Sequence, residues 1–346
     1  MNSDIIKETT LSNTKSRSSR STSIDVAKLA GVSQATVSRA FDPSSKMRPQ
    51  TREKVLLAAK ELRYTPDAIA KSLNSNTTNI IAIIMQDVVN PFYSKILKDF
   101  SLYLQKYGKQ LLYFYLDSPN NLHNLIYQVL QYRVEGIIIS SVTLTPQSIG
   151  AFSDYSVPVV LFNRYVDIPQ IQAVCCDNVQ AGRECADHFF SKGYRSFAFI
   201  GGSDEALTSF DRKNGFLSRL KERGIHNTIV VDSDFTYDSG FQAFETLFQT
   251  YSDYPRAIFC ANDAICAGVI DCIRYKYNLR IPEDIALIGF DDIKLASYLP
   301  YQITTFEQPT NQMIQKACEL ILHPTLKPQI PNLTLFPCTL KIRSTS

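Results

Sequence analysis

Residues 22–41 read TSIDVAKLAGVSQATVSRAF and carry two helical patterns on either side of one glycine. In the first pattern Thr22 stands where an N-cap belongs, and Asp25 follows three residues later, close to a capping box. Gly31 can take the positive φ angle of a tight turn, and Ser33 can cap the helix that follows. Helix, tight turn and helix in this order predict a helix-turn-helix, which constrains this part of the chain to a small all-α domain.

The second helix, predicted over Gln34–Phe41, would bury Val37 and Phe41 and expose its opposite face. Glutamine can bond N6 and N7 of adenine, arginine can bond O6 and N7 of guanine, and each good pair contributes roughly 1–3 kcal/mol of discrimination. The candidate DNA-contacting residues are Thr22, Ser33, Gln34, Ala35, Thr36, Ser38, Arg39, Thr51, Tyr64, Lys71 and Leu73. For the helix-turn-helix residues alone, a small three-helix core with an ordinary polar surface is the alternative.

A third helix is predicted from Pro49, which fits a first helical turn, to about Arg63. Its expected inward stripe is Val55, Leu56, Ala59 and Leu62, and Thr51, Arg52 and Lys54 are expected to face phosphates. The next segment, DAIAKSL, would form a two-turn helix that is too short to be stable alone. Leu73 at its end would be a wedge in the minor groove, although a lone exposed leucine is normal on any surface.

The charge of the chain is unevenly distributed. Residues 1–75 hold 13 Lys and Arg against 7 Asp and Glu, whereas the remaining residues hold 23 against 26, which agrees with a DNA-binding end. The length of 346 residues, with 45% hydrophobic content, allows a second, larger domain. The predicted organisation is a disordered, mainly solvated arm at 1–21, the helix-turn-helix domain at 22–63, a hinge helix and linker at 64–78, and a ligand-binding core at 79–346.

From Asn79 onward, apolar runs alternate with amphipathic stretches, which is typical of parallel α/β architecture. The pattern begins with IIAIIM and a helix that turns Phe92, Ile96, Phe100 and Leu104 inward, and it later includes a helix over Asp211–Arg223. Two such series predict two doubly wound parallel-sheet subdomains. The first subdomain is expected to comprise residues of about 79–177 and 309–335, and the second those of about 178–308 and 336–346.

Ligands of open α/β sheets bind beyond the carboxyl ends of the strands, so polar residues directly after each apolar run are candidates. They are Asp87 to Phe92, Asn163-Arg164, Asp177, Asp204 to Arg212, Asp234-Phe235, Asn262-Asp263 and Asp291-Asp292. Carboxylates, amides, arginines and aromatic rings together suit a polyhydroxylated ligand. About half of these residues are expected only to cap helices, with Asp177, Asp291 and Asp292 the strongest cases.

The motifs DVAKLAGVSQATVSR, TREKV and L-x-Y-x-P-D-A-I-A-K-S-L resemble the lactose/galactose repressor (LacI/GalR) family of transcriptional regulators. N-P-F-Y, N-R-Y-V-D, R-x-x-G-F, A-N-D and G-F-D-D stand in the family's order, so the similarity spans residues 22 to about 345. The resemblance implies a core like a type I periplasmic sugar-binding protein, a recognition helix for each operator half-site and a hinge helix that folds on DNA. Asp67 departs from the Asn that the family commonly has there.

The resemblance also implies roles for core residues. Phe92 would line one wall of the cleft, Arg212 and Asp263 would clasp ligand hydroxyls, and Phe235 would stack on the ring. Asn163 and Arg164 would add a clamp, and Asp291 completes the candidate set. The expected effector is a sugar or sugar phosphate, and a purine corepressor is the less favoured alternative because SDEALTSFD replaces longer polar contacts before Arg212.

The expected partner is double-stranded operator DNA with a pseudo-palindromic sequence, read by a homodimer, because one helix-turn-helix buries too little surface for tight specific binding. Absence of leucine heptads after the last predicted strand argues against a tetramer. Effector binding would change the pairing of the two hinge segments, either as induction or as corepression.

Other classes of protein fit less well. The four histidines, His123, His188, His226 and His323, offer no catalytic set, and no G-x-G-x-x-G follows a strand, so neither an enzyme nor a cofactor is expected.

Eight cysteines without a C-x-x-C pair predict reduced core thiols, and Cys185 with His188 would not make a metal site. A solute-binding protein needs a signal peptide, which the start lacks, and no apolar run approaches the ~20 residues of a membrane span, so a cytoplasmic protein is expected.

Overall fold

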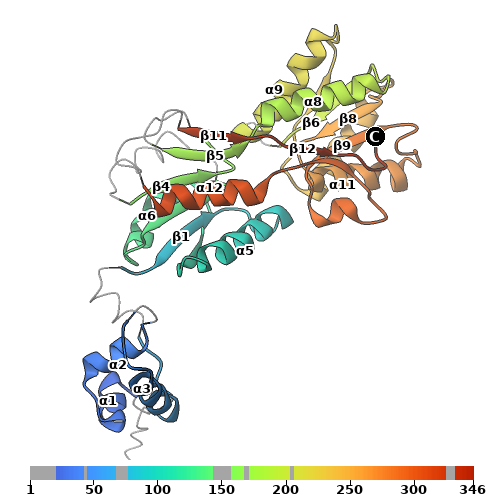
Figure 1. The fold of residues 1–346 in the computed structure, drawn as a ribbon. Coiled ribbons are helices and arrows are strands. Elements are labelled where there is room, and N and C mark those ends of the chain that lie inside the picture. Colours follow the sequence, from blue (N-terminus) through green and yellow to red (C-terminus); the bar gives the residue numbers. More distant parts are fainter. Residues whose placement is uncertain are drawn as a thin grey trace, which may run out of the picture. The chain divides into compact units, whose positions relative to one another are not determined.

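The computed structural model describes residues 21–42, 45–67, 77–142, 157–166, 171–202, 206–324 and 332–346. The chain divides into two compact units, at the boundary between Thr78 and Asn79, and Figure 1 shows the elements of each. The predicted N-terminal arm, the predicted hinge helix and its residues Lys71 and Leu73 lie outside the described residues.

The described residues of the first unit form three helices: α1 (Ser23–Ala30), α2 (Gln34–Ala40) and α3 (Pro49–Glu61). Thr22 and Asp25 form a complete capping box at the start of α1. Gly31 has a φ angle of 60° after α1, and the Ser33 side chain accepts a hydrogen bond from the Thr36 amide at the start of α2. These features confirm the predicted helix-turn-helix.

The core of the first unit is built from small and β-branched residues: Val26, Ala27, Ala30, Val37, Ala40, Val55, Ala58 and Ala59. The prediction that Leu56 faces inward is wrong, because 43% of this residue is exposed. Val55, Ala58 and Ala59 lie on one face of α3 at helical spacing, and Leu56 is turned about 100° away from Val55. Arg63, with a φ angle of 50°, lies beyond the end of α3, so the helix is shorter than predicted.

The described residues of the second unit form two six-stranded sheets. The first has the order β11-β5-β4-β3-β1-β2 and the second β12-β10-β9-β8-β6-β7. Neighbouring strands of the described residues pair in parallel, apart from β12, which runs antiparallel to β10. The first-sheet strands are β1 (Ile80–Met85), β2 (Gln110–Tyr115), β3 (Gly136–Ser140), β4 (Val159–Phe162), β5 (Gln172–Cys176) and β11 (Leu333–Phe336). The second-sheet strands are β6 (Phe197–Ile200), β7 (Ile229–Val231), β8 (Ala257–Cys260), β9 (Ala286–Asp291), β10 (Thr304–Glu307) and β12 (Thr339–Lys341).

Helices cover both sheets, as expected for the predicted doubly wound α/β fold. With the first sheet are α5 (Pro91–Gln105), the short 3₁₀ helix η1 (Pro119–Asn121), α6 (Leu122–Leu130) and α12 (Thr310–Leu322). With the second are α8 (Asn178–Ser191), α9 (Leu207–Glu222), α10 (Tyr237–Thr250), α11 (Asp263–Asp271), the π-helical η2 (Cys272–Lys276) and the 3₁₀ helix η3 (Lys294–Ser297). Figure 1 shows α5 and α12 side by side at the first sheet. The chain passes from one sheet to the other after β5, after β10 and after β11.

The predicted inward residues of α5, Phe92, Ile96, Phe100 and Leu104, are all buried, and Tyr93 is buried as well. Helix α9 begins at Leu207, four residues before the predicted start. Its first turn is buried at Thr208 and Ser209, and the Ser209 hydroxyl accepts a hydrogen bond from the Gly202 amide. This contact joins the first turn of α9 to the end of β6.

Glycines let two pairs of helices approach closely. A Cβ atom at Gly182 of α8 would lie 2.3 Å from the Arg212 carbonyl oxygen, and one at Gly215 of α9 would lie 2.1 Å from that of Val179. Gly240 of α10 and Gly268 of α11 are equally close to the facing backbone. Because α8 and α9 meet at backbone atoms, this contact fixes the position of the α9 backbone.

All eight cysteines are unpaired, and all but Cys338 are buried, as the sequence predicts. The Cys185 side chain is buried, whereas the Nε2 atom of His188 lies 3.0 Å from the Ser346 hydroxyl. In the described part of the chain, no helix combines the length and the apolar character that a bilayer span requires.

Candidate functional site

The exposed face of α2 is one candidate site. Gln34, Ala35, Ser38 and Arg39 are exposed on it, opposite the buried Val37. Among the described residues, the Arg39 guanidinium makes only long contacts, 3.4 Å to the Ala35 carbonyl oxygen and 3.5 Å to the Thr36 hydroxyl. The Gln34 amide donates to the Ser23 hydroxyl at 2.9 Å. A surface helix with weakly held polar side chains near its N-terminus is suited to reading base edges in a major groove.

Other predicted DNA contacts lie around this face. Ser33 is exposed, and its hydroxyl lies 2.9 Å from that of Thr36. The Thr22 hydroxyl donates to Asp25 in the capping box, Thr51 is half-buried in the first turn of α3, and the Tyr64 ring packs edge-on against Phe41.

Arg52 does not fit the expectation that it faces phosphate. Its guanidinium donates to the carbonyl oxygens of Asp42 and Ser45, at 3.0 and 2.8 Å. Because both bonds hold the segment between α2 and α3, Arg52 has a structural role there.

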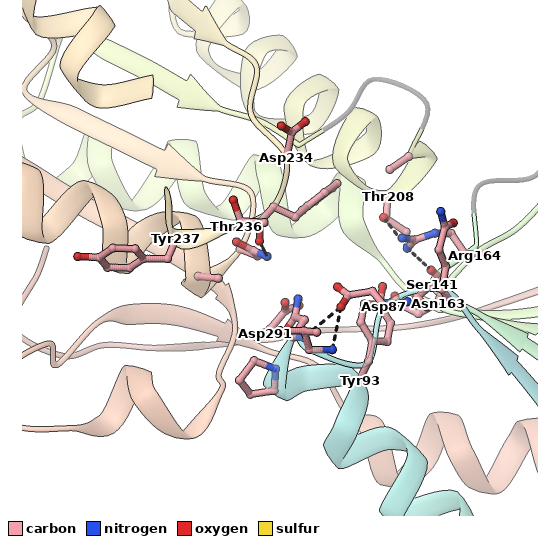
Figure 2. Close-up of a pocket in the computed structure, with 18 of the residues that line it drawn as sticks. Asp87, Tyr93, Ser141, Asn163, Arg164, Thr208, Asp234, Thr236, Tyr237 and Asp291 are labelled. Atoms are coloured by element: carbon pink, nitrogen blue, oxygen red, sulfur yellow. Dashed lines mark hydrogen bonds between the residues drawn. The ribbon is translucent and has the colours of Figure 1, made fainter. Parts of the chain in front are cut away.

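A cavity of about 550 Å³ in the second unit is the other candidate site. Its walls come from the carboxyl ends of β1, β3 and β4 in the first sheet and of β8 and β9 in the second, with the first turns of α9 and α10. Figure 2 shows Asp87, Tyr93, Ser141 and Asn163 on one side of it and Asp234 and Thr236 on the other. This is where the strand-end argument predicts a ligand.

The structure brings five of the seven predicted effector residues to the cavity: Asn163, Arg164, Arg212, Phe235 and Asp291. Phe92 is not among them, because it is 3% exposed and packs in the hydrophobic core against the Tyr93 ring. Tyr93, one residue later in the first turn of α5, lines the cavity instead. Helical geometry turns consecutive residues about 100° apart, so only one of the two can face the cavity.

Asp263 is the other predicted residue that does not line the cavity. It is fully buried. Its carboxylate accepts hydrogen bonds from the Thr305 hydroxyl at 2.6 Å and from the Ile293 amide at 2.9 Å. Burial raises the pKa of Asp263 well above its usual range. This side chain therefore fixes the loop after β9, and its neighbour Asn262, which caps α11, lines the cavity.

Arg212 is 3% exposed and is held on several sides. Its Nε donates to Asn178 at 2.8 Å, its Nη1 donates to the Ala261 carbonyl oxygen, and its guanidinium carbon lies 3.5 Å from the centroid of the Phe290 ring. Its Nη2 lies 4.0 Å from Asp291. Arg212 thus presents one edge of a fixed guanidinium to the cavity.

The sequence predicts that Asp177, Asp291 and Asp292 only cap helices, and the structure meets this prediction in part. Asp177 caps α8, and Asp292 pairs with Arg343 at 2.7 Å. Asp291 caps no helix; it accepts a hydrogen bond from the Gln308 amide at 2.7 Å and lines the cavity.

Backbone strain is concentrated at this site. Ser141, Asn163, Phe235 and Asp291 all line the cavity and have φ angles between 54° and 104°. Left-handed backbone is uncommon for residues other than glycine and costs of order 1–3 kcal/mol at each sparsely populated position. Such clustering is typical of ligand sites, where the surrounding fold holds side chains in directions that regular strands would not give.

Phe235 has a specific neighbour that sequence reasoning did not identify. A Cβ atom at Gly202 would lie 2.0 Å from the Phe235 ring, so only glycine leaves room for the ring there. Sequence reasoning also missed Ser141, Thr236 and Tyr237. Ser141 could have been found, because it follows the apolar run GIII by the same rule that selected the other candidates.

Two hydrogen bonds join the segment after β4 to α9 of the other sheet. Nη1 of Arg164 donates to the Thr208 hydroxyl at 3.2 Å, and the Tyr165 hydroxyl donates to Asp211 at 2.8 Å. Figure 2 shows the first of these beside the cavity. The two halves of the second unit are therefore linked here as well as through the segments that cross between the sheets.

The protonation of Asp291 leads to a prediction about pH. Burial raises its pKa to about 6, although Arg212 and Gln308 act in the opposite direction. Because the pKa of Asp291 in the folded chain lies above its ordinary value of 3.8, the contribution of Asp291 to stability is fully present below pH 3.8 and is lost as pH rises through about 6. We expect Asp291→Asn to gain stability relative to the wild type when the pH is raised from about 4 to about 7.

Urea unfolding of both proteins at the two pH values measures this difference. An unchanged difference would contradict the raised pKa. In both proteins the other titrating groups are the same, so their effects cancel in the comparison.

Two family models match the chain: bacterial regulatory proteins of the lacI family at residues 24–67, and a periplasmic binding protein-like domain at residues 186–346. Catabolite control protein A of Priestia megaterium is 32% identical over 290 residues, or 82% of this chain and 86% of that protein. The transcriptional repressor PurR of Pectobacterium atrosepticum is 31% identical over 307 residues, or 86% and 88%. A solved structure of a complex of the transcriptional regulator CelR with cellobiose is 27% identical, with a TM-score of 0.70, and covers 94% of this chain and 100% of that one.

Proposed function

The chain belongs to the LacI family of bacterial regulatory proteins, and on this premise we propose a repressor that binds operator DNA through α2 and a small polyhydroxylated effector in the cavity of the second unit. The observation that carries the DNA part is the exposed face of α2, where Gln34, Ala35 and Arg39 stand near the helix N-terminus. Because a single helix of this size reads few base pairs, we further propose a homodimer on a pseudo-palindromic site.

The effector part rests on the composition of the cavity. Carboxylates, amides, hydroxyls and two arginines line it, and the Phe235 ring provides an apolar face. These groups can donate to and accept from adjacent hydroxyls, and a ring can pack on the apolar side of a sugar. The cellobiose complex of the similar regulator supports a carbohydrate as the ligand.

A purine is the second candidate effector, and the similarity to a PurR repressor favours it. A thermal-shift screen with sugars, sugar phosphates, sugar acids and purines separates the two, because a ligand at 100 times its dissociation constant adds about 2.7 kcal/mol to stability. Stabilisation by purines alone would reject the carbohydrate. An operator-binding titration with and without the stabilising ligand then tests regulation, and no change in operator affinity would contradict an effector role.

Arg39→Ala is expected to weaken binding to an operator selected by the wild type by about 10- to 100-fold, which corresponds to roughly 1–3 kcal/mol for a bidentate base contact. Binding to a scrambled duplex should change far less. Lys60→Ala, on the exposed side of α3, is a control for the loss of one positive charge. Fluorescence anisotropy with both duplexes measures the effect, and equal losses for Arg39→Ala would argue against base reading.

A further inference from the structure

Two cysteine side chains meet where the chain passes from one sheet of the second unit to the other. Cys176 is the last residue of β5, and Cys338 lies between β11 and β12. The chain leaves the first sheet after β5 and again after β11. A thiol therefore stands at each of two segments that connect the halves of this unit.

These two connecting segments run side by side. Strands β5 and β11 pair in parallel with Phe336 opposite Cys176, and the Asp177 amide donates to the Phe336 carbonyl oxygen at 2.8 Å. Cys338, two residues beyond Phe336, packs against the hydrophobic core that contains Cys176. The two thiols are hydrogen-bonded to each other, so their sulfur atoms are in contact.

The thiol pair belongs to a chain of hydrogen bonds that reaches the effector cavity. The Cys176 thiol donates to Oδ1 of Asn178 at 3.4 Å, and the same oxygen accepts from Nε of Arg212 at 2.8 Å. Because the Cys176 proton is used on Asn178, Cys338 is the donor within the pair. A change at the thiols therefore alters the support of an arginine that lines the cavity.

The two thiols differ in their access to solvent. Cys176 is fully buried, whereas Cys338 is the partly exposed cysteine of the chain. An oxidant in solution meets Cys338 first, and Cys176 stands behind it as the resolving thiol. The hydrogen bond to Cys176 and burial raise the pKa of the Cys338 thiol. Because the thiolate is the nucleophile, we expect its oxidation to be slow at neutral pH and faster as pH rises.

Cys260 and Cys266 form a contrasting pair. Their thiols are also hydrogen-bonded to each other, but both residues are fully buried. Cys260 ends β8 and Cys266 lies in α11, so both belong to the second-sheet half. A disulfide between them would not link the two halves, and neither thiol is open to an oxidant in solution.

We propose that hydrogen peroxide oxidises Cys176 and Cys338 to a disulfide, which joins the two connecting segments and restrains the halves of the second unit against each other. The Cys338 sulfur attacks one peroxide oxygen and the O–O bond breaks, which gives a sulfenic acid and one water molecule. The Cys176 sulfur then attacks the sulfenic sulfur, and the S–S bond forms as a second water molecule leaves. Two thiols are oxidised to one disulfide while one peroxide is reduced to two water molecules.

The disulfide would connect residues that lie far apart in the sequence. Such a bond restricts the unfolded chain, and the restriction increases with the length of the closed loop. It also keeps the two segments together, so the hydrogen bond between Asp177 and Phe336 should open less often. The oxidised protein should therefore be more stable and more rigid at these segments.

Formation of the bond is tested with the full chain in hydrogen peroxide. Free thiols are alkylated under denaturing conditions, and peptides are mapped without reduction. We expect a cross-link between Cys176 and Cys338 that forms faster at about pH 8.5 than at about pH 7 and that dithiothreitol reverses. Cys338→Ser should abolish it. Cys266→Ala, which breaks the contrasting pair, and Cys175→Ala, on the opposite face of β5, should leave it unchanged.

The restraint is tested by urea unfolding and by amide hydrogen exchange of peptides that contain Asp177. Oxidation of the wild type should shift the unfolding midpoint to higher urea and slow the exchange of the Asp177 amide by about tenfold. Cys338→Ser, treated in the same way, should show neither change. Neither measurement involves DNA or an effector, so the outcome is separate from that of the proposed function.

Oxidation of Cys338 to a sulfinic acid without a cross-link to Cys176 would overturn the proposed disulfide. A cross-link that leaves both the unfolding midpoint and the Asp177 exchange unchanged would overturn the proposed restraint.

Discussion

Arg212→Met is expected to abolish the response to effector while leaving operator binding in the absence of effector unchanged. The guanidinium presents its Nη2 edge to the cavity from a fixed position, so its loss removes the charge-assisted hydrogen bonds that we propose it donates to ligand hydroxyls. Two such bonds correspond to a loss of affinity of at least about 100-fold. The predicted DNA-contacting residues lie in the other compact unit and are not altered.

The same substitution should destabilise the second unit. It leaves Asp291 buried without its cation, and removing one partner of a buried pair costs about 3–5 kcal/mol. Arg212→Met with Asp291→Asn should recover stability, because no carboxylate is then left unpaired, but it should not recover ligand binding. Urea unfolding and calorimetry separate the two effects. Ligand binding by the double variant at wild-type affinity would show that the ligand contact is misplaced.

Gly215→Ala is expected to destabilise the second unit by about 3 kcal/mol, although alanine is the better helix former by about 1 kcal/mol. The added Cβ atom would lie 2.1 Å from the carbonyl oxygen of Val179, which is backbone and cannot rotate away. Helices α8 and α9 would have to separate, and Arg212 would move with α9. We therefore expect weaker effector binding in addition to lower stability.

Lys221→Ala is the matched control, since Lys221 is exposed on the same helix and its removal should change stability by less than about 0.5 kcal/mol. Urea unfolding of the two variants gives the comparison. A Gly215→Ala variant as stable as the control would mean that the helices tolerate a wider spacing than the structure shows.

Much of the fold follows from local rules in the sequence. The capping box at Thr22, the left-handed Gly31 and the cap at Ser33 are determined by neighbouring residues, so their structure could be predicted. Long apolar runs similarly identify the strands, and the carboxyl ends of those strands locate the cavity.

The errors at the site are displacements by one residue. Tyr93 rather than Phe92 lines the cavity, and Asn262 rather than Asp263 does so. Adjacent residues point in different directions on a helix or strand, so which one faces a ligand depends on where the turn begins. Asp291 shows the same dependence, because its φ angle of 104° sets its direction and no neighbouring residue type predicts that angle.

Both sheets of the second unit include strands from the far end of the chain. Strand β11, at residues 333–336, lies at the edge of the first sheet beside β5, and β12, at residues 339–341, lies at the edge of the second. A ribosome that makes the chain from its N-terminus releases helices α1, α2 and α3 of the first unit long before these strands. Neither half of the second unit can be completed until residues 333–341 have been synthesised, so a nascent chain acquires its folded DNA-binding helices before its effector-binding core is complete.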